Sequence, residues 1–84
     1  MAFLHVIWDL DDDPDGNVQH IAEHDITKAE VLEVLDWPEL CEFSHSSGRP
    51  VAIGTTSAGR SIIVVYEQVD EDTIYPVTAY DLEE

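Results

Sequence analysis

The order of apolar and polar positions along the chain predicts one strand, two helices and then four more strands. The apolar run Phe3–Trp8 is rich in residues that favour strands and predicts the first of them. Residues 9–16 form an acidic, turn-rich loop. The segment 17–25 carries apolar residues at i, i+3 and i+4, which predicts a short helix with Asp15 or Asn17 as its N-cap.

The second helix has the clearest boundaries in the sequence. Thr27 and Glu30 have the T-x-x-E spacing of a capping box, and Ile26 with Val31 occupies the positions of a hydrophobic staple. Trp37-Pro38 should end the helix, because the residue before a proline is disfavoured in the α region. Its buried face is predicted to consist of Val31, Leu32, Val34 and Leu35.

From Leu40 onward the apolar period changes to two, which is typical of strands. The four segments predicted as strands are Cys41–Ser46, Val51–Thr55, Arg60–Val69 and Thr73–Tyr80. Short connections with Gly, Pro or Asp favour antiparallel hairpins between them. Ile62–Tyr66 is apolar on both faces and should be central, whereas Pro76 should lie on an edge strand or at a bulge because it has no N–H.

These elements predict a single α+β domain over residues 1–84 with the order β-α-α-β-β-β-β. A chain of 84 residues has room for one domain, and its hydrophobic content of 44% suits a packed core. We expect two helices packed on one face of a curved, mainly antiparallel sheet.

The charge balance restricts the partners that this chain can bind. It has 3 Lys+Arg and 19 Asp+Glu, which gives a formal net charge of −16. Nucleic-acid binding requires cations that neutralise phosphates, so direct binding to nucleic acid is disfavoured and a basic protein partner is favoured. Two alternatives are an acidic surface that only maintains solubility and an adaptation to a salt-rich environment.

Cysteine usage and hydropathy predict a cytoplasmic protein with no membrane segment. Cys41 is the sole cysteine, has no neighbouring cation to activate it, and is expected to be buried and structural. The longest aliphatic run, Ile62–Val65, is far too short to span a bilayer, and the first residues lack the positive flank of a signal peptide.

The motifs of the chain resemble the BrnT family of bacterial type II toxins, which are related to the RelE-type ribonucleases. The matching stretches are Trp8-Asp9, 21–27 with Glu30-Val31, 52–60, Ile62–Tyr66 and Val77–Tyr80. The resemblance implies a RelE-like fold and an antitoxin as partner. Where the family has a basic residue and a Gly around its helix-1 His, this chain has Glu23 and Asp25, and its last strand runs into Asp81 instead of a basic segment.

The resemblance carries three catalytic positions over to this chain, namely His24, Arg60 and Tyr80. A metal-independent ribonuclease needs a base, an acid and a cation, which are the chemistries of these side chains. Tyr66 and Glu67 are weaker additions. The competing interpretation is structural: His24 would cap its helix, and Arg60 would pair with a surface carboxylate.

Two segments have some of the residues of a metal site without its full requirements. His20 and His24 fit H-x-x-E-H, but the chain offers no evident further ligand for zinc. The loop 9–16 is rich in carboxylates, but it lacks the EF-hand spacing that calcium binding would need. We therefore expect no cofactor and no dedicated metal site.

The sequence thus predicts a small BrnT-like, toxin–antitoxin-related protein that acts by protein–protein interaction and has weak or lost ribonuclease activity. One alternative is an active metal-independent ribonuclease toxin that uses His24, Arg60 and Tyr80. Another is an acidic module that binds a basic protein partner.

Overall fold

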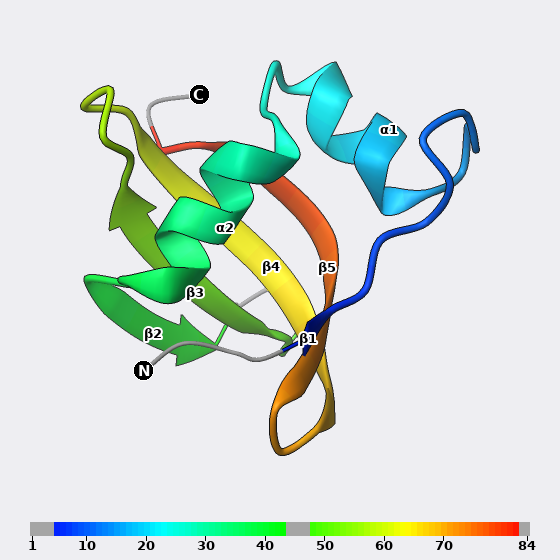
Figure 1. Cartoon of the computed structure of the whole chain (residues 1–84). Coiled ribbons are helices and arrows are strands. Elements are labelled where there is room, and N and C mark those ends of the chain that lie inside the picture. Colours follow the sequence, from blue (N-terminus) through cyan, green and yellow to red (C-terminus); the bar gives the residue numbers. More distant parts are fainter. Residues whose placement is uncertain (1–4, 44–47, 83–84) are drawn as a thin grey trace.

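The fold is built on a five-stranded mixed sheet with the strand order β1-β5-β4-β3-β2 (Figure 1). The computed structural model describes residues 5–43 and 48–82. In chain order the elements are β1 (His5–Val6), α1 (Asn17–Glu23), α2 (Lys28–Asp36), β2 (Leu40–Phe43), β3 (Pro50–Thr55), β4 (Ser61–Asp70) and β5 (Thr73–Asp81). The predicted α+β class is confirmed: the chain has two helices and a five-stranded mixed sheet that is not closed.

The four later strands form an antiparallel meander, and β1 pairs with β5 in parallel. β4 is the middle strand, which confirms the prediction made from its two apolar faces. β5 lies between β1 and β4, so Pro76 is not on an edge strand. The register shifts where Val65 pairs with Thr78 and Tyr66 pairs with Pro76, so the proline sits at an irregularity where a missing N–H is tolerated.

The helices and the sheet share one hydrophobic core. α2 contacts β3 and β4, and α1 contacts β5. The buried core consists of Ile21, Ile26, Val31, Val34, Leu35, Ala52, Ile62, Val64, Tyr66, Ile74 and Ala79. Gly54 allows α2 to approach β3 closely, because a Cβ at this position would lie 3.3 Å from Val34 Cγ1. Figure 1 shows α2 crossing the sheet and α1 beside the curved β5.

The predicted boundaries of α2 are confirmed. Glu30 N donates to Thr27 Oγ1 over 3.2 Å, and Thr27 N donates to Glu30 Oε1 over 3.0 Å, which completes the capping box. The helix ends at Asp36 with Trp37 as C-cap. One residue of the predicted buried face is wrong: Leu32 is exposed, because the buried stripe needs only Val31, Val34 and Leu35 on this nine-residue helix.

The start of α1 differs from the prediction. Its N-cap is Gly16, with no side-chain cap bond, so neither Asp15 nor Asn17 has that role. The N–H of Asn17 instead donates to Asp9 Oδ2 over 2.9 Å, so a carboxylate from the preceding loop serves the helix end. Gly16 permits this approach, because a Cβ there would lie 2.7 Å from the Cβ of Asp9.

Asn17 is itself a buried link between three segments. Its side chain donates to Ile7 O and to Pro76 O, each over 2.9 Å, and accepts from Asp9 N over 2.9 Å. A buried polar side chain needs hydrogen-bond partners, and both the amide oxygen and the amide nitrogen of Asn17 have them. Asn17 therefore joins the chain after β1, the start of α1 and the middle of β5.

Two predictions about the strands need correction. Cys41 is exposed and not buried, because β2 is the outer strand of the sheet and none of its residues is covered. The first strand extends only over His5–Val6 within the described residues, while Phe3 and Leu4 lie outside them. Residues 44–47, which include the predicted end of the β2 strand, also lie outside the described part.

Among the described residues, no helix is long and apolar enough to cross a bilayer.

Candidate functional site

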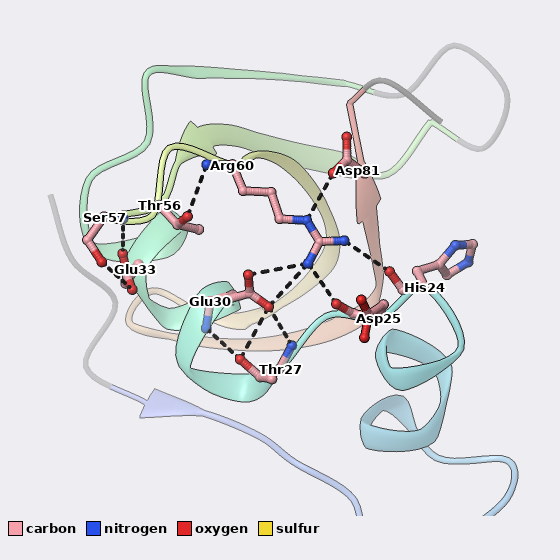
Figure 2. Close-up of polar contacts among 9 residues, drawn as sticks. All are labelled: His24, Asp25, Thr27, Glu30, Glu33, Thr56, Ser57, Arg60 and Asp81. Atoms are coloured by element: carbon pink, nitrogen blue, oxygen red, sulfur yellow. Dashed lines mark hydrogen bonds and ion pairs between the residues drawn. The ribbon is translucent and has the colours of Figure 1, made fainter.

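Arg60 is the centre of a polar cluster at the corner between α1 and α2 (Figure 2). Its Nε donates to Asp81 Oδ2 over 2.9 Å, and its Nη1 lies 3.3 Å from Glu30 Oε2. Nη1 also donates to the carbonyl of Asp25 over 2.7 Å, and Nη2 donates to the carbonyl of His24 over 3.3 Å. Each of the three guanidinium nitrogens therefore has an acceptor within the protein.

A tight turn between β3 and β4 holds the backbone of Arg60 in place. Thr56 N donates to Arg60 O over 2.8 Å, and Arg60 N donates to Thr56 Oγ1 over 3.3 Å. The turn passes through Gly59 with φ of 85°, a conformation that glycine adopts without steric strain. Ser57 N additionally donates to Glu33 Oε2 over 2.6 Å, which fixes the turn to α2. The guanidinium is thus directed toward the corner between the helices.

The corner itself presents carbonyl groups that need donors. His24 is the C-cap of α1, and Asp25 has φ of 61°, the left-handed conformation common just after a helix end. The last carbonyls of a helix have no partner within the helix. Arg60 supplies donors to the carbonyls of His24 and Asp25, so its position stabilises the end of α1 as well as the turn into α2.

The electrostatic environment keeps the guanidinium charged. The hydrogen bond to Asp81 is the largest cause that raises the pKa of Arg60, and Glu30 contributes in the same direction against partial desolvation. The side chains of Arg60, Glu30 and Asp81 are only 26%, 21% and 26% exposed. Water therefore screens this group less than it screens an ordinary surface ion pair.

The three residues predicted from the family resemblance come together in the structure. The rings of His24 and Tyr80 lie 6.1 Å apart between centroids and are tilted by 51°. Arg60 reaches the backbone of His24, so all three positions share one corner of the molecule. The two weaker candidates have other contacts: Tyr66 belongs to the hydrophobic core, and Glu67 pairs with Arg49 over 3.1 Å.

The chemistry open to this corner is restricted by the engagement of Arg60. An imidazole, a phenol and a guanidinium are suitable for acid–base cleavage of a phosphodiester. A phosphate would first have to displace Asp81 and Glu30 from the guanidinium, and both are negatively charged competitors. No pocket is found among residues 5–43 and 48–82 that would hold a nucleotide against these groups.

The acidic and histidine-containing segments do not form a metal site within the described residues. No group of three or more His, Cys, Asp or Glu side chains is arranged there to hold a metal ion. In the acidic loop, Asp9 Oδ2 accepts from Tyr75 Oη over 2.5 Å, and Asp11 pairs with Lys28 over 2.8 Å. The hydrogen bond from Tyr75 is the main reason why the pKa of Asp9 is lowered.

Sequence reasoning does not identify the acidic partners of Arg60. In the sequence, Glu30 stands out only as part of a capping box, and Asp81 only as part of an acidic tail. No local signal links them, because they approach Arg60 from α2 and the end of β5.

Comparison of the chain with protein-family models, curated proteins and solved structures finds no match.

Proposed function

We propose that this chain is a BrnT-like protein of a toxin–antitoxin module that acts by contact with a basic protein, such as an antitoxin, and that its ribonuclease activity is weak or lost. The observation that carries the proposal is the engagement of Arg60 by two carboxylates and two carbonyls. A cation held in this way stabilises the fold, and its charge is already balanced by two carboxylates.

The other two cations of the chain support the same conclusion. Lys28 pairs with Asp11 over 2.8 Å, and Arg49 pairs with Glu67 over 3.1 Å. Every Lys and Arg in the sequence is therefore next to a carboxylate, while the net charge is −16. RNA binding depends on the neutralisation of phosphates by protein cations, whereas a basic protein is attracted by this field.

Two features support the family resemblance itself. Asp25, at the position where the family has Gly, has a left-handed backbone with φ of 61°, which is the conformation that favours glycine. His24, Arg60 and Tyr80 converge on one corner. The element order and the mixed sheet are compatible with the same fold.

A second candidate function, a metal-independent ribonuclease toxin, is favoured by that same convergence. In this candidate His24 and Tyr80 exchange protons with the 2′-hydroxyl and the leaving oxygen, and Arg60 binds the negative charge of the transition state. This requires that an RNA phosphate replace Glu30 and Asp81 at the guanidinium. The proposal and this candidate therefore differ in one measurable property, the cleavage of RNA.

The test combines an RNA cleavage assay with a binding assay. Purified protein is incubated with total RNA at low salt, beside the His24→Ala variant; we expect no cleavage by either. The immobilised protein is then exposed to extract from its native cells and eluted with rising salt, with an unrelated protein of equal net charge as control. We expect a basic protein that is retained only by this chain. Cleavage that disappears in His24→Ala supports the ribonuclease, and absence of any specifically retained basic protein contradicts the proposal.

A further inference from the structure

The outer strand β2 is the least covered element of the sheet. All four of its residues are exposed, including the large apolar side chains of Leu40 and Phe43, which are 50% and 70% exposed. Trp37, at the end of α2, is 82% exposed. In Figure 1 β2 lies on the side of the sheet remote from α1 and β5. Large apolar side chains left exposed on an outer strand offer contact area to a partner.

The charged residues of segment 36–43 are all acidic. Asp36, Glu39 and Glu42 are exposed and recur at every third position along residues 36–43, with apolar groups between them. The sequence has no Lys or Arg between Lys28 and Arg49. The edge therefore combines apolar contact area, the outer side of a strand and three carboxylates. We call residues 36–43 the β2 edge.

We infer that the β2 edge binds an extended segment of a partner protein, in which apolar residues alternate with Lys or Arg, as an added strand of the sheet. The inference rests on the proposed function and names the surface and the partner chemistry that serve it. Addition of a strand provides backbone hydrogen bonds for affinity, and the alternate side chains of the added strand provide specificity.

The register of β2 shows which side chains of such a segment would contact which residues of the strand. Directly paired residues of an antiparallel ladder share a face, so Cys41 and Phe43 lie on the same face as their partners Ala52 and Pro50. Ala52 belongs to the core beneath α2, which places Phe43 on the helix side of the sheet. Glu42 lies on the opposite face. An alternating segment would thus place apolar side chains beside Phe43 and cations beside Glu42.

Charge argues against a second copy of the chain as the occupant. Two copies joined edge to edge would bring together two sets of Asp36, Glu39 and Glu42 and two molecules of net charge −16. Like charges placed directly opposite each other in a sheet are destabilising. A basic segment converts this repulsion into attraction, and its binding should weaken as salt screens the charges.

The experiment uses Cys41, the only cysteine, as a reporter in the middle of the β2 edge. The probe is a seven-residue peptide of alternating valine and lysine, blocked at both ends. The controls are a valine–glutamate peptide and a valine–lysine peptide with a central proline. Alkylation of Cys41 by iodoacetamide is timed with and without each peptide. At a peptide concentration ten times its Kd, we expect alkylation about 10-fold slower with the valine–lysine peptide and unchanged with either control.

Matched variants locate the contact. Phe43→Ser should weaken binding of the valine–lysine peptide by about 10-fold, the effect of losing one well-packed apolar contact. Val69→Ser is the control, since Val69 is also exposed but lies at the far end of β4. Both positions are exposed, and circular dichroism checks that both variants are folded.

Each outcome decides a different question. Equal protection by the valine–glutamate peptide overturns the charge argument, and equal protection by the proline peptide overturns strand addition. Protection of Cys41 that rises with protein concentration alone makes a second copy the occupant and overturns the inference. A basic partner that binds the chain while Cys41 stays reactive overturns the β2 edge but leaves the proposed function intact. If no basic partner binds, the proposed function fails as well.

Discussion

Replacement of Asn17 by alanine tests how strongly one buried side chain holds three parts of the fold together. Asn17 is 1% exposed, and its amide contacts Ile7 O, Pro76 O and Asp9 N. Alanine removes all three hydrogen bonds and leaves their backbone partners in place. Because a buried polar group without a partner costs more than the net value of its hydrogen bond, the effect should exceed that of an ordinary surface change.

The magnitude follows from the environment of each bond. The bond to Pro76 O is buried and the other two are partly buried. About 2 kcal/mol for the buried bond and about 1 kcal/mol for each of the others give a loss of about 4 kcal/mol. A domain of this size has a free energy of unfolding of about 4–13 kcal/mol. Asn17→Ala should therefore remove a large part of the stability.

The assay is urea unfolding followed by circular dichroism. Gln19→Ala is the matched control, because Gln19 is an amide two positions along the same helix whose side chain donates to the exposed carbonyl of Asp11. We expect the control to change the free energy of unfolding by less than about 0.5 kcal/mol. A loss below about 1 kcal/mol for Asn17→Ala would refute the reasoning, since it would show that the three backbone groups find other partners at little cost.

Three further predictions concern the other contacts of the site and the loop. Arg60→Ala should lower the Tm far more than Arg49→Ala, measured by thermal unfolding, because Arg60 joins four groups and Arg49 forms an exposed pair. The hydrogen bond to Asp9 raises the pKa of Tyr75 to about 12. The stability that this bond contributes is therefore fully present below a pH of about 10 and is lost as the pH rises toward 12. Tyr75→Phe should abolish this pH dependence of the free energy of unfolding, measured across that range. Gly16→Ala should destabilise by about 1–3 kcal/mol in urea, because its Cβ would lie 2.7 Å from that of Asp9.

The parts of the fold that depend on local chemistry were predictable from the sequence. The Thr27–Glu30 capping box and the end of α2 before Pro38 are determined by residues within a few positions of each other. The central position of β4 followed from its apolar residues on both faces. In each case neighbouring residues contain the whole physical reason for the structure.

The parts that depend on distant segments were not predictable in this way. The sequence favours Asn17 as a helix cap, but its side chain bonds a carbonyl of β5 and a carbonyl of the chain after β1. Cysteine is usually buried, so the sequence favours a core position for Cys41, whereas its strand is the outermost one among the described residues. Arg60 could be found as a candidate, and its acidic partners could not, because they come from α2 and β5. Tertiary contacts decided each of these.

The parallel pairing of β1 with β5 has a consequence for the order of folding. β1 cannot join the sheet until β5 is present, and the contacts that fix the segment after β1 to β5, Asn17 with Pro76 and Tyr75 with Asp9, close loops of 59 and 66 positions. Contacts between such distant positions form slowly, whereas the hairpins from β2 to β5 are local. We expect β1 to join the sheet late in folding, after the contacts of the meander and α2 have formed.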